Sequence, residues 1–361
     1  MKRLVHSSRF AVLPLVLTML VAGSSFIQAD NGPNHKVRNL NFGVSGGNVR
    51  DISRRFCCSG TLGGLLQDAQ GVQYVLSNNH VMGLAGAATA GDDISQPGLI
   101  DTGCRIATVV ADFTASAPLS SNVDASIAQL RTGQMNATGF IEDIGVISSV
   151  VKNPAVGLQV QKSGRTTGHT TGASISSISA TVSIKYPTEC GGNKGPVFTF
   201  TNQVIINSST FSAGGDSGSV ILTTGTCPQP VALLFAGSST STIGNRMTDV
   251  INRLNTASGK SLSFVGVACG TALAMEQNED TIPGIPRELI ARAIDIKERN
   301  ENRIMSKNSV IGMGVGAADD NPLEPVIHVY VDQTTGKKPR IPKKIEGLRV
   351  KVIYTDTFVA Y

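Results

Sequence analysis

The stretch Gly214-Gly215-Asp216-Ser217-Gly218-Ser219 places a serine among small, turn-forming residues. A serine hydroxyl is a weak nucleophile at neutral pH, so it needs a neighbouring base, and the base needs a partner that fixes its tautomer. The chain offers both, His80 after the run Leu76-Ser77-Asn78-Asn79 and Asp124 before Ala125-Ser126-Ile127. All three residues lie at the ends of apolar, strand-like runs or in the loops between them. We therefore predict a catalytic triad of His80, Asp124 and Ser217.

Each part of this triad has a simpler explanation when it is taken alone. A Gly-Asp-Ser-Gly stretch arises easily in a chain with 39 glycines, a lone histidine is more often structural, and Asp124 could cap a turn. His169 is the alternative base, but it lies in a Thr/Gly-rich loop and no aspartate follows at a matching separation. The three residues together, in this order, favour the triad.

The glycine before the nucleophile has its own expected role. The chain must turn sharply at Ser217 and direct backbone N–H groups at the oxyanion that forms during acyl transfer. Gly215 and Ser217 are the expected donors. Each such donor stabilises the transition state by roughly 3–4 kcal/mol in related chemistry.

The N-terminus has the pattern of a secretory signal peptide. Lys2, Arg3 and Arg9 accompany an apolar stretch over residues 10–21, and Ile27-Gln28-Ala29 is a plausible cleavage site. A membrane anchor is the alternative, but an apolar stretch of about 12 residues is too short to span a bilayer comfortably. We expect residues 1–29 to be removed and the protein to be secreted or periplasmic.

The bulk composition fits a mainly β protein. The chain has 361 residues, many glycines, no tryptophan and only 16% charged residues, which suits short strands and many turns. Loss of the basic N-terminal residues brings the net charge of +5 towards neutrality, so we expect neither nucleic acid nor an anionic membrane as a partner. No later apolar run is long enough to cross a membrane. We expect no metal and no cofactor.

Six cysteines in an exported chain allow disulfides, and six allow fifteen full pairings. Their spacing matches no zinc pattern. We favour Cys58 with Cys104, which bracket His80, and Cys190 with Cys227, which bracket Ser217, because each bond would fix a loop beside a catalytic residue. Buried free thiols are the alternative for some of them.

Short apolar runs separated by Gly, Asn, Asp and Ser continue from residue 58 to about residue 264, after a polar leader over residues 30–45. Many short strands at this spacing suggest a sandwich or a pair of barrels. A helix is expected at residues 247–254. The expected strands are residues 60–66, 73–77, 106–112, 125–129, 145–147, 157–162, 172–185, 197–206, 219–223 and 230–238.

Charged residues become more frequent after about residue 274, which indicates a domain boundary. We predict a body over residues 46–274 and a small α+β domain over residues 275–361. That domain would hold a helix at residues 286–304 and strands at 310–316, 326–332 and 348–355. Its sequence carries no chemical motif. Three uses are open: an autoinhibitory or folding-assisting segment, a substrate or partner module, and a surface for self-association. We favour a regulatory or partner-binding role.

The His, Asp, Ser order resembles that of chymotrypsin-like proteases and differs from the subtilisin and α/β-hydrolase orders. Together with the stretch Lys162-Ser163-Gly164-Arg165-Thr166-Thr167-Gly168, it makes the chain similar to secreted bacterial trypsin-like serine proteases. The chain also resembles the plant narrow-leaf protein family. The resemblance covers about residues 45–265 and implies two antiparallel β-barrels with the triad in the cleft between them.

The chain departs from that family in ways that matter. The residues around His80 and the residue Ser219 differ from the commonest pattern, and no start sequence is present that could insert a freed amine beside Asp216. In the bacterial relatives an internal basic residue pairs with this carboxylate. The resemblance therefore implies that Asp216 pairs with Lys162 or Arg165, which would make the domain competent without trypsin-type cleavage. A solvated Lys and Arg on a turn are the alternative.

The resemblance also locates the substrate pocket. Trypsin-like enzymes place an acid about six residues before the nucleophile, where this chain has Phe211. The pocket walls are expected at Phe235, Ala236 and Gly237. We therefore expect an apolar or small side chain before the scissile bond, rather than Lys or Arg.

Three functions compete at this point. The first is an active serine endopeptidase acting on protein or peptide substrates. The second is a protease-like protein that has lost catalysis and binds partners, and the third is an esterase that uses the same triad. The triad order favours the endopeptidase.

Overall fold

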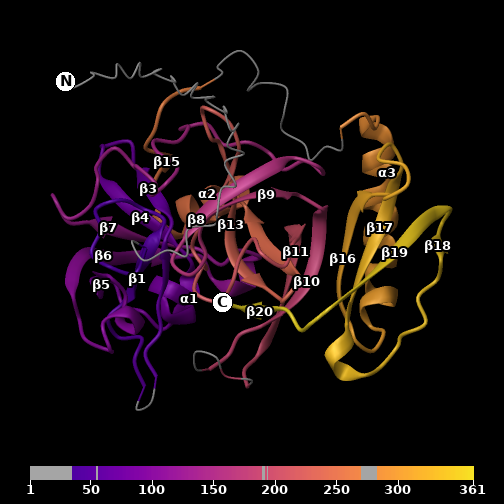
Figure 1. Ribbon diagram of the computed structural model, residues 1–361, viewed down its shortest axis with the longest axis horizontal. Coiled ribbons are helices and arrows are strands. Elements are labelled where there is room, and N and C mark those ends of the chain that lie inside the picture. The colour runs from indigo at the N-terminus through magenta and orange to yellow at the C-terminus, as the bar shows by residue number, and fades with distance from the viewer. Residues whose placement is uncertain (1–34, 54–55, 189–191, 193, 270–282) are drawn as a thin grey trace, which may run out of the picture.

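The computed structural model describes residues 35–361, except residues 54–55, 189–191, 193 and 270–282. The predicted signal peptide and Cys190 lie outside the described residues. The described chain forms two large, curled β-sheets with a few short helices (Figure 1). The prediction of a mainly β body is confirmed.

The first sheet contains eight strands, all paired antiparallel. It lies on the left of Figure 1, where its strands are drawn in indigo to purple except for β15, which is orange. Its strands are, in spatial order, β15 (Ser263–Phe264), β3 (Gly64–Gln67), β4 (Gln73–Ser77), β7 (Ser126–Leu130), β6 (Thr108–Ser116), β5 (Asp93–Gln96), β1 (Val44–Asn48) and β2 (Gly60–Leu62).

The second sheet contains twelve strands. Eleven lie on one path and β20 (Val359–Ala360) pairs with both β10 and β13. The path runs through β18 (Lys344–Ile345), β19 (Leu348–Thr355), β17 (Pro325–Asp332), β16 (Val310–Ala317), β10 (Ser177–Lys185), β11 (Val197–Asn207), β14 (Ser241–Arg246), β13 (Pro230–Gly237), β12 (Val220–Thr223), β8 (Gln159–Gly164) and β9 (Gly168–Ser174).

Three α-helices lie in the described part of the chain. The short α1 (Asn79–Met82) carries His80, and α2 (Met247–Ser258) packs against β13 and β6. The long α3 (Arg287–Met305) lies on β16 and β17, at the right of Figure 1. Short 3₁₀ turns occur at η2 (Leu84–Gly86), η3 (Leu99–Asp101), η4 (Leu119–Ser121) and η5 (Gln333–Thr335).

The C-terminal segment is joined to the body through a continuous sheet. β16 pairs antiparallel with β10, with Ile178 opposite Val315, and α3 covers the new strands. Apolar side chains of α3, β10 and β16 share one core cluster, in which Ile178, Ile296 and Met313 are buried. The predicted domain boundary near residue 275 falls within residues that the structure does not describe, so it stays a prediction.

The predicted strands mostly agree with the observed ones, and β4 and β19 agree to the residue. The predicted strand at 172–185 is two strands, because β9 pairs with β8 whereas β10 pairs with β11. The predicted strand at 145–147 is wrong, since only an isolated bridge between Ile141 and Gly145 forms there. His35, in the described part of the predicted loose leader, packs on the body, where it is fully buried and its Nε2 atom lies 2.9 Å from Asp143 Oδ2.

Candidate active site

His80 and Asp124 form a close pair at the edge of the first sheet. β4 ends at Ser77, and α1 begins two residues later, which places His80 on its first turn. Asp124 precedes β7 and is fully buried. The His80 Nδ1 atom lies 2.5 Å from Asp124 Oδ2, and the backbone N–H of His80 donates to Asp124 Oδ1 at 3.1 Å. The carboxylate therefore fixes both the ring and the backbone of the histidine.

Two further residues hold Asp124, and the sequence did not indicate either. Tyr186, at the end of β10, donates its hydroxyl hydrogen to Asp124 Oδ2 at 2.7 Å. The backbone N–H of Asp124 donates to Asn245 Oδ1 at 2.9 Å. Tyr186 also packs edge-on against the His80 ring, with 5.9 Å between the ring centroids. These contacts connect the first sheet to the second, so no local sequence pattern could reveal them.

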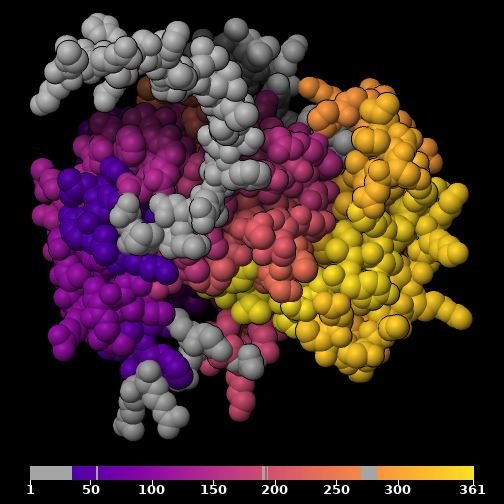
Figure 2. Space-filling model, in the orientation of Figure 1, coloured from indigo at the N-terminus to yellow at the C-terminus, as the bar shows by residue number. Residues whose placement is uncertain are grey.

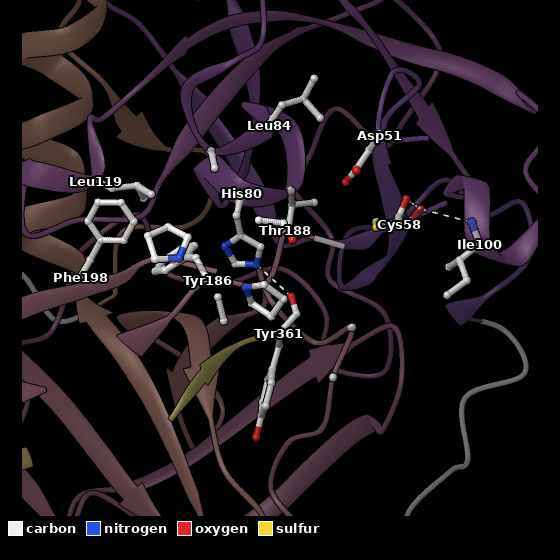
Figure 3. A pocket seen from close by; sticks show the side chains of 18 of the residues that line it. Asp51, Cys58, His80, Leu84, Ile100, Leu119, Tyr186, Thr188, Phe198 and Tyr361 are labelled. Carbon is white, nitrogen blue, oxygen red and sulfur yellow. Dashed lines mark hydrogen bonds between the residues drawn. The ribbon is translucent and has the colours of Figure 1, made fainter. Parts of the chain in front are cut away.

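The side chain of Ser217 is hydrogen-bonded to a different group and is not among the residues that line the cleft at His80. It is fully buried in the turn before β12, and its Oγ donates to the backbone carbonyl of Phe235 at 3.1 Å. The Nε2 atom of His80 instead contacts the carbonyl oxygen of Tyr361 at 2.9 Å (Figure 3). The structure thus joins His80 and Asp124, and places a backbone carbonyl of the chain's last residue where the histidine faces the cleft.

Both hydrogen-bond partners of the His80 ring are acceptors, which requires a proton on each ring nitrogen. Burial by itself lowers the pKa of His80, but the charge and hydrogen bond of Asp124 and the Tyr361 carbonyl outweigh it. The net pKa is raised above the ordinary value of 6.5. Asp51, which lines the same cleft, has a pKa raised to about 6 by burial, and the charge of His80 opposes this rise.

The turn at Gly215 orients the two predicted oxyanion donors. Gly215 has φ +99°, and a Cβ there would lie 2.5 Å from Thr166 Oγ1. The carbonyl preceding the Gly215 N–H accepts from Thr166 Oγ1 at 2.7 Å, and the carbonyl preceding the Ser217 N–H accepts from the Ser219 N–H at 3.0 Å. Because N–H and C=O point in opposite directions in a trans peptide, fixing these carbonyls also fixes the two N–H groups. Their catalytic role stays a prediction.

Asp216 and Lys162 form a fully buried ion pair, with 3.5 Å between Lys162 Nζ and Asp216 Oδ2. Asp216 also accepts hydrogen bonds from the backbone N–H groups of Thr166, Thr167 and Ala213. Burial lowers the pKa of Lys162, and the charge of Asp216 partly restores it. Of the two predicted bases, Lys162 reaches this carboxylate.

Arg165 has a different partner. Its guanidinium binds both carboxylate oxygens of Asp101 at 2.6 Å, in a bidentate pair that is mostly buried. Its backbone N–H donates to Thr61 Oγ1 at 3.0 Å. Arg165 thus ties the turn before β9 to the first sheet, at the border of the cleft.

Three of the four predicted pocket residues lie in apolar core clusters. Phe211 and Phe235 are buried in apolar clusters, and the ring of Phe235 lies 5.0 Å from that of Phe200. Ala236 is buried in the same cluster as Phe235. Gly237 lies against the ring of Tyr361, because a Cβ there would lie 2.2 Å from its hydroxyl oxygen, and none of the four is among the residues that line the cleft at His80.

The cleft at His80 has a volume of about 610 Å³ (Figure 3). One side comes from the first sheet, with Asp51, Ser59 and Leu84, and the other from Tyr186, Phe198 and the Gly214–Gly215 turn. Ala360 and Tyr361 also line it. The walls are mostly apolar, which suits an extended peptide.

Both predicted disulfides are wrong. Cys57, rather than Cys58, is bonded to Cys104, with 5.5 Å between the Cα atoms, and Cys227 is bonded to Cys269, with 6.3 Å. Cys58 is also in a disulfide. Neighbouring residues of an extended chain point to opposite sides, so the choice between Cys57 and Cys58 depends on the backbone orientation and not on position along the sequence.

Within the described ranges, no group of three His, Cys, Asp or Glu side chains is placed to hold a metal ion. No helix in this part of the chain has the length and apolar character needed to span a membrane.

The chain is similar to bacterial serine proteases of the chymotrypsin fold. It resembles a glutamic acid-specific serine protease with a histidine triad in substrate binding, at 18% identity, over 62% of this chain and 98% of that one, with a TM-score of 0.43. A Nocardiopsis protease matches at 14% identity over 62% and 98%, with a TM-score of 0.40. A Thermobifida fusca protease matches at 16% identity over 63% and 98%, also with 0.40.

One curated protein is also similar in sequence. The rice protein Narrow Leaf 1 (Oryza sativa subsp. japonica) is 32% identical over 146 residues. The match covers 39% of this chain and 23% of the rice protein, so the chain spans about a quarter of its length. No protein-family profile matches the chain.

Proposed function

We propose that the protein is a serine endopeptidase in which Ser217 is the nucleophile, His80 the general base and Asp124 its orienting acid. One observation carries the proposal. The buried Asp124 holds His80 Nδ1 at 2.5 Å, while the opposite ring nitrogen, Nε2, faces the cleft and contacts the backbone oxygen of Tyr361 at 2.9 Å. Asp124 thus directs Nε2 towards the cleft, where a general base must take the proton of a nucleophile.

In the proposed reaction, Ser217 Oγ attacks the carbonyl carbon of the scissile peptide bond and His80 Nε2 takes its proton. The backbone N–H groups of Gly215 and Ser217 stabilise the oxyanion. The C–N bond then breaks as His80 returns the proton to the leaving amine, which leaves an acyl-enzyme that water hydrolyses. Asp124 and Tyr186 keep the imidazole in position throughout.

One observation favours the alternative of a protease-like protein without catalysis. Ser217 Oγ donates to Phe235 O, and not to His80. The carbonyl of Tyr361 occupies the Nε2 atom that the serine would use. Under our proposal, departure of residue 361 frees Nε2, and a rotation about the Cα–Cβ bond of Ser217 brings Oγ to the histidine.

Labelling by a fluorophosphonate tests the nucleophile directly. We expect covalent labelling of the wild-type protein at Ser217, and none in Ser217→Ala or His80→Ala. Hydrolysis of the ester alone, and not of a matched peptide, would support an esterase. Hydrolysis of the peptide would support the endopeptidase, whether or not the ester is also hydrolysed. Absence of labelling both in the wild-type protein and in a variant that ends at Phe358 would support the non-catalytic alternative.

The same proposal covers partners and location. Disulfides persist in oxidising compartments, and the two described bonds support an exported protein that acts on extracellular or periplasmic peptides. We propose no role for nucleic acid, a metal or a cofactor. The α+β unit formed by α3, β16, β17 and β19 is proposed to have a regulatory or partner-binding role.

A further inference from the structure

The last residues of the chain add a strand to the second sheet at the cleft. β20 pairs antiparallel with β13, with Ala360 opposite Ala236 and Val359 opposite Gly237. Tyr361 N–H donates to Phe235 O at 3.3 Å, which is the same carbonyl that accepts from Ser217 Oγ. Strand addition of this kind is a common way to bind an extended peptide. In Figure 1 the C-terminus lies between the two halves of the molecule.

The backbone of Tyr361 lies among the proposed catalytic groups. Its N–H shares an acceptor with Ser217 Oγ, and its carbonyl oxygen contacts His80 Nε2. The backbone of residue 361 therefore reaches both the acceptor of the proposed nucleophile and the ring of the proposed base. The acyl part of a bound substrate has to reach the same two groups.

The side chain of Tyr361 enters a pocket beside Gly237. Its hydroxyl donates to Ser238 O at 3.0 Å. A Cβ on Gly237 would lie 2.6 Å from Tyr361 Cζ, so only glycine leaves room for the ring. Burial raises the pKa of Tyr361 to about 12, which keeps the hydroxyl protonated as a donor.

Resting on the proposed peptidase function, we propose that residues 359–361 bind as the acyl part of a peptide substrate does, and that the pocket beside Gly237 selects a tyrosine or phenylalanine directly before the cleaved bond. A basic side chain finds no open carboxylate there, because Asp216 is paired with Lys162 and saturated by backbone N–H groups. This inference replaces the expectation of an apolar or small side chain with an aromatic one.

The rest of the C-terminal unit delivers this segment to the cleft. Thr355, at the end of β19, bonds Ser238 Oγ through its hydroxyl at 2.5 Å, and Phe358 is fully buried beside Tyr330. Figure 2 shows the yellow C-terminal residues extending from the right side of the molecule to its centre. A tethered segment has an effective concentration of the order of millimolar, so residues 359–361 compete with any free substrate.

Hydrolysis of matched substrates tests the selectivity. The variant that ends at Phe358 keeps the buried anchor and lacks the competing segment. We expect it to cleave acetyl-Phe-Val-Ala-Tyr-para-nitroanilide about tenfold or more faster, in kcat/KM, than the analogues with Ala, Lys or Glu in place of Tyr. The full chain should be slower with the tyrosine substrate by about tenfold or more. A preference for Lys, Glu or Ala, or no preference, would overturn the inference.

Two side-chain variants keep the test valid if the shortened chain does not fold. Tyr361→Ala retains the strand pairing and removes only the ring, so it should also relieve the competition. Gly237→Ala fills the pocket, so the ratio of kcat/KM for the tyrosine substrate to that for the alanine substrate should fall by about tenfold. An unchanged ratio in Gly237→Ala would contradict the assigned pocket.

A binding experiment separates this inference from the proposed catalysis. The peptide acetyl-Phe-Val-Ala-Tyr should bind the variant that ends at Phe358 and carries Ser217→Ala, measured by calorimetry, and acetyl-Phe-Val-Ala-Lys should bind about tenfold more weakly or not at all. If the peptide binds, but fluorophosphonate does not label Ser217 in a chain that keeps this serine, the proposed peptidase function is refuted and the proposed peptide-binding site is retained. Labelling at Ser217 with equal binding of both peptides would refute the selectivity alone.

Discussion

Asp124 accepts three hydrogen bonds, from the His80 ring, the His80 backbone N–H and the Tyr186 hydroxyl. A buried carboxylate needs such donors, because burial without them strongly disfavours its charge. Burial and the neighbouring Asp124 raise the pKa of Tyr186 well above its ordinary value, so its hydroxyl stays a donor. Tyr186 therefore acts as a positioning residue for the proposed base.

Removing that hydroxyl tests this role. We expect Tyr186→Phe to lower kcat by about tenfold with little change in KM, because a hydrogen bond to a charged group contributes about 1.5–3 kcal/mol, part of which orients the imidazole. Tyr354→Phe is the matched control, since that ring is 52% exposed. Equal kcat values for the two variants, from steady-state kinetics, would remove Tyr186 from the site.

The state of His80 predicts the pH dependence of activity. The base must be unprotonated, and the pKa of His80 is raised, so kcat/KM should rise with pH and reach half its maximum above pH 6.5. Part of that rise comes from the Tyr361 carbonyl, so the variant ending at Phe358 should reach half-maximum at lower pH. The protonated His80 stabilises the folded state below pH 6.5, and this contribution is lost as pH rises through the raised pKa. Coincident pH profiles of the two chains would contradict this prediction.

Lys162 and Arg165 should respond differently to substitution. Lys162→Met leaves Asp216 charged and buried, and we expect it to lower the free energy of unfolding by about 3–5 kcal/mol and to abolish most of the activity. Arg165→Met removes the ion pair with Asp101 at the border of the cleft, so we expect a smaller decrease in the free energy of unfolding and a smaller loss of activity. Denaturant unfolding and peptide hydrolysis measure the two effects. Full activity in both variants would refute the role of an internal base.

At the scale of elements, α3 depends on packing for its stability. Its apolar side chains face β16 and β17, where Ile290, Ala293 and Ile296 are buried, whereas Leu289 is 43% exposed. A helix alone in water gains little from its intrinsic propensity, so the buried face determines its place on the sheet.

Two truncations in α3 compare a buried with an exposed position. We expect Ile296→Ala to lower the free energy of unfolding by about 2–5 kcal/mol, because it leaves a cavity in the shared core. Leu289→Ala, on the same helix, should change it by much less. Thermal or denaturant unfolding of the full chain measures both, and similar losses would show that α3 does not pack as described.

At the scale of the whole molecule, the second sheet extends from the body into the C-terminal unit without a break. The β16–β10 pairing and the cluster that includes Ile178 and Met313 connect the two parts. The same unit supplies residues 359–361 to the cleft. Removing it would expose the edge of β10 and open the site at once.

This continuity predicts cooperative unfolding. Calorimetry of the full chain should give a single transition, with equal calorimetric and van't Hoff enthalpies, because the parts share a sheet and a core. Two separate transitions would indicate an independent C-terminal domain, as the change in composition near residue 275 suggested. The disulfides should be kept intact during the measurement.

The sequence alone determined the features that local chemistry specifies. Apolar runs bounded by turn residues located β4 and β19 to the residue, because side-chain alternation and turn preferences act over a few positions. The order of His80, Asp124 and Ser217 predicted a triad, of which the structure shows the contact between His80 and Asp124, and the role of Ser217 stays a prediction. The Cys58–Cys104 and Cys190–Cys227 pairings failed, since disulfide partners are chosen by backbone orientation in the folded chain.

Only the tertiary structure decided the contacts between distant segments. Tyr186 meets Asp124 across 62 positions, and Tyr361 meets His80 across 281. β20 is a strand of two residues whose pairing partners lie more than a hundred positions away, so its sequence carries no period that could predict it. Such contacts form because two sheets and a helix bury a common core, and that packing brings the end of the chain to the cleft.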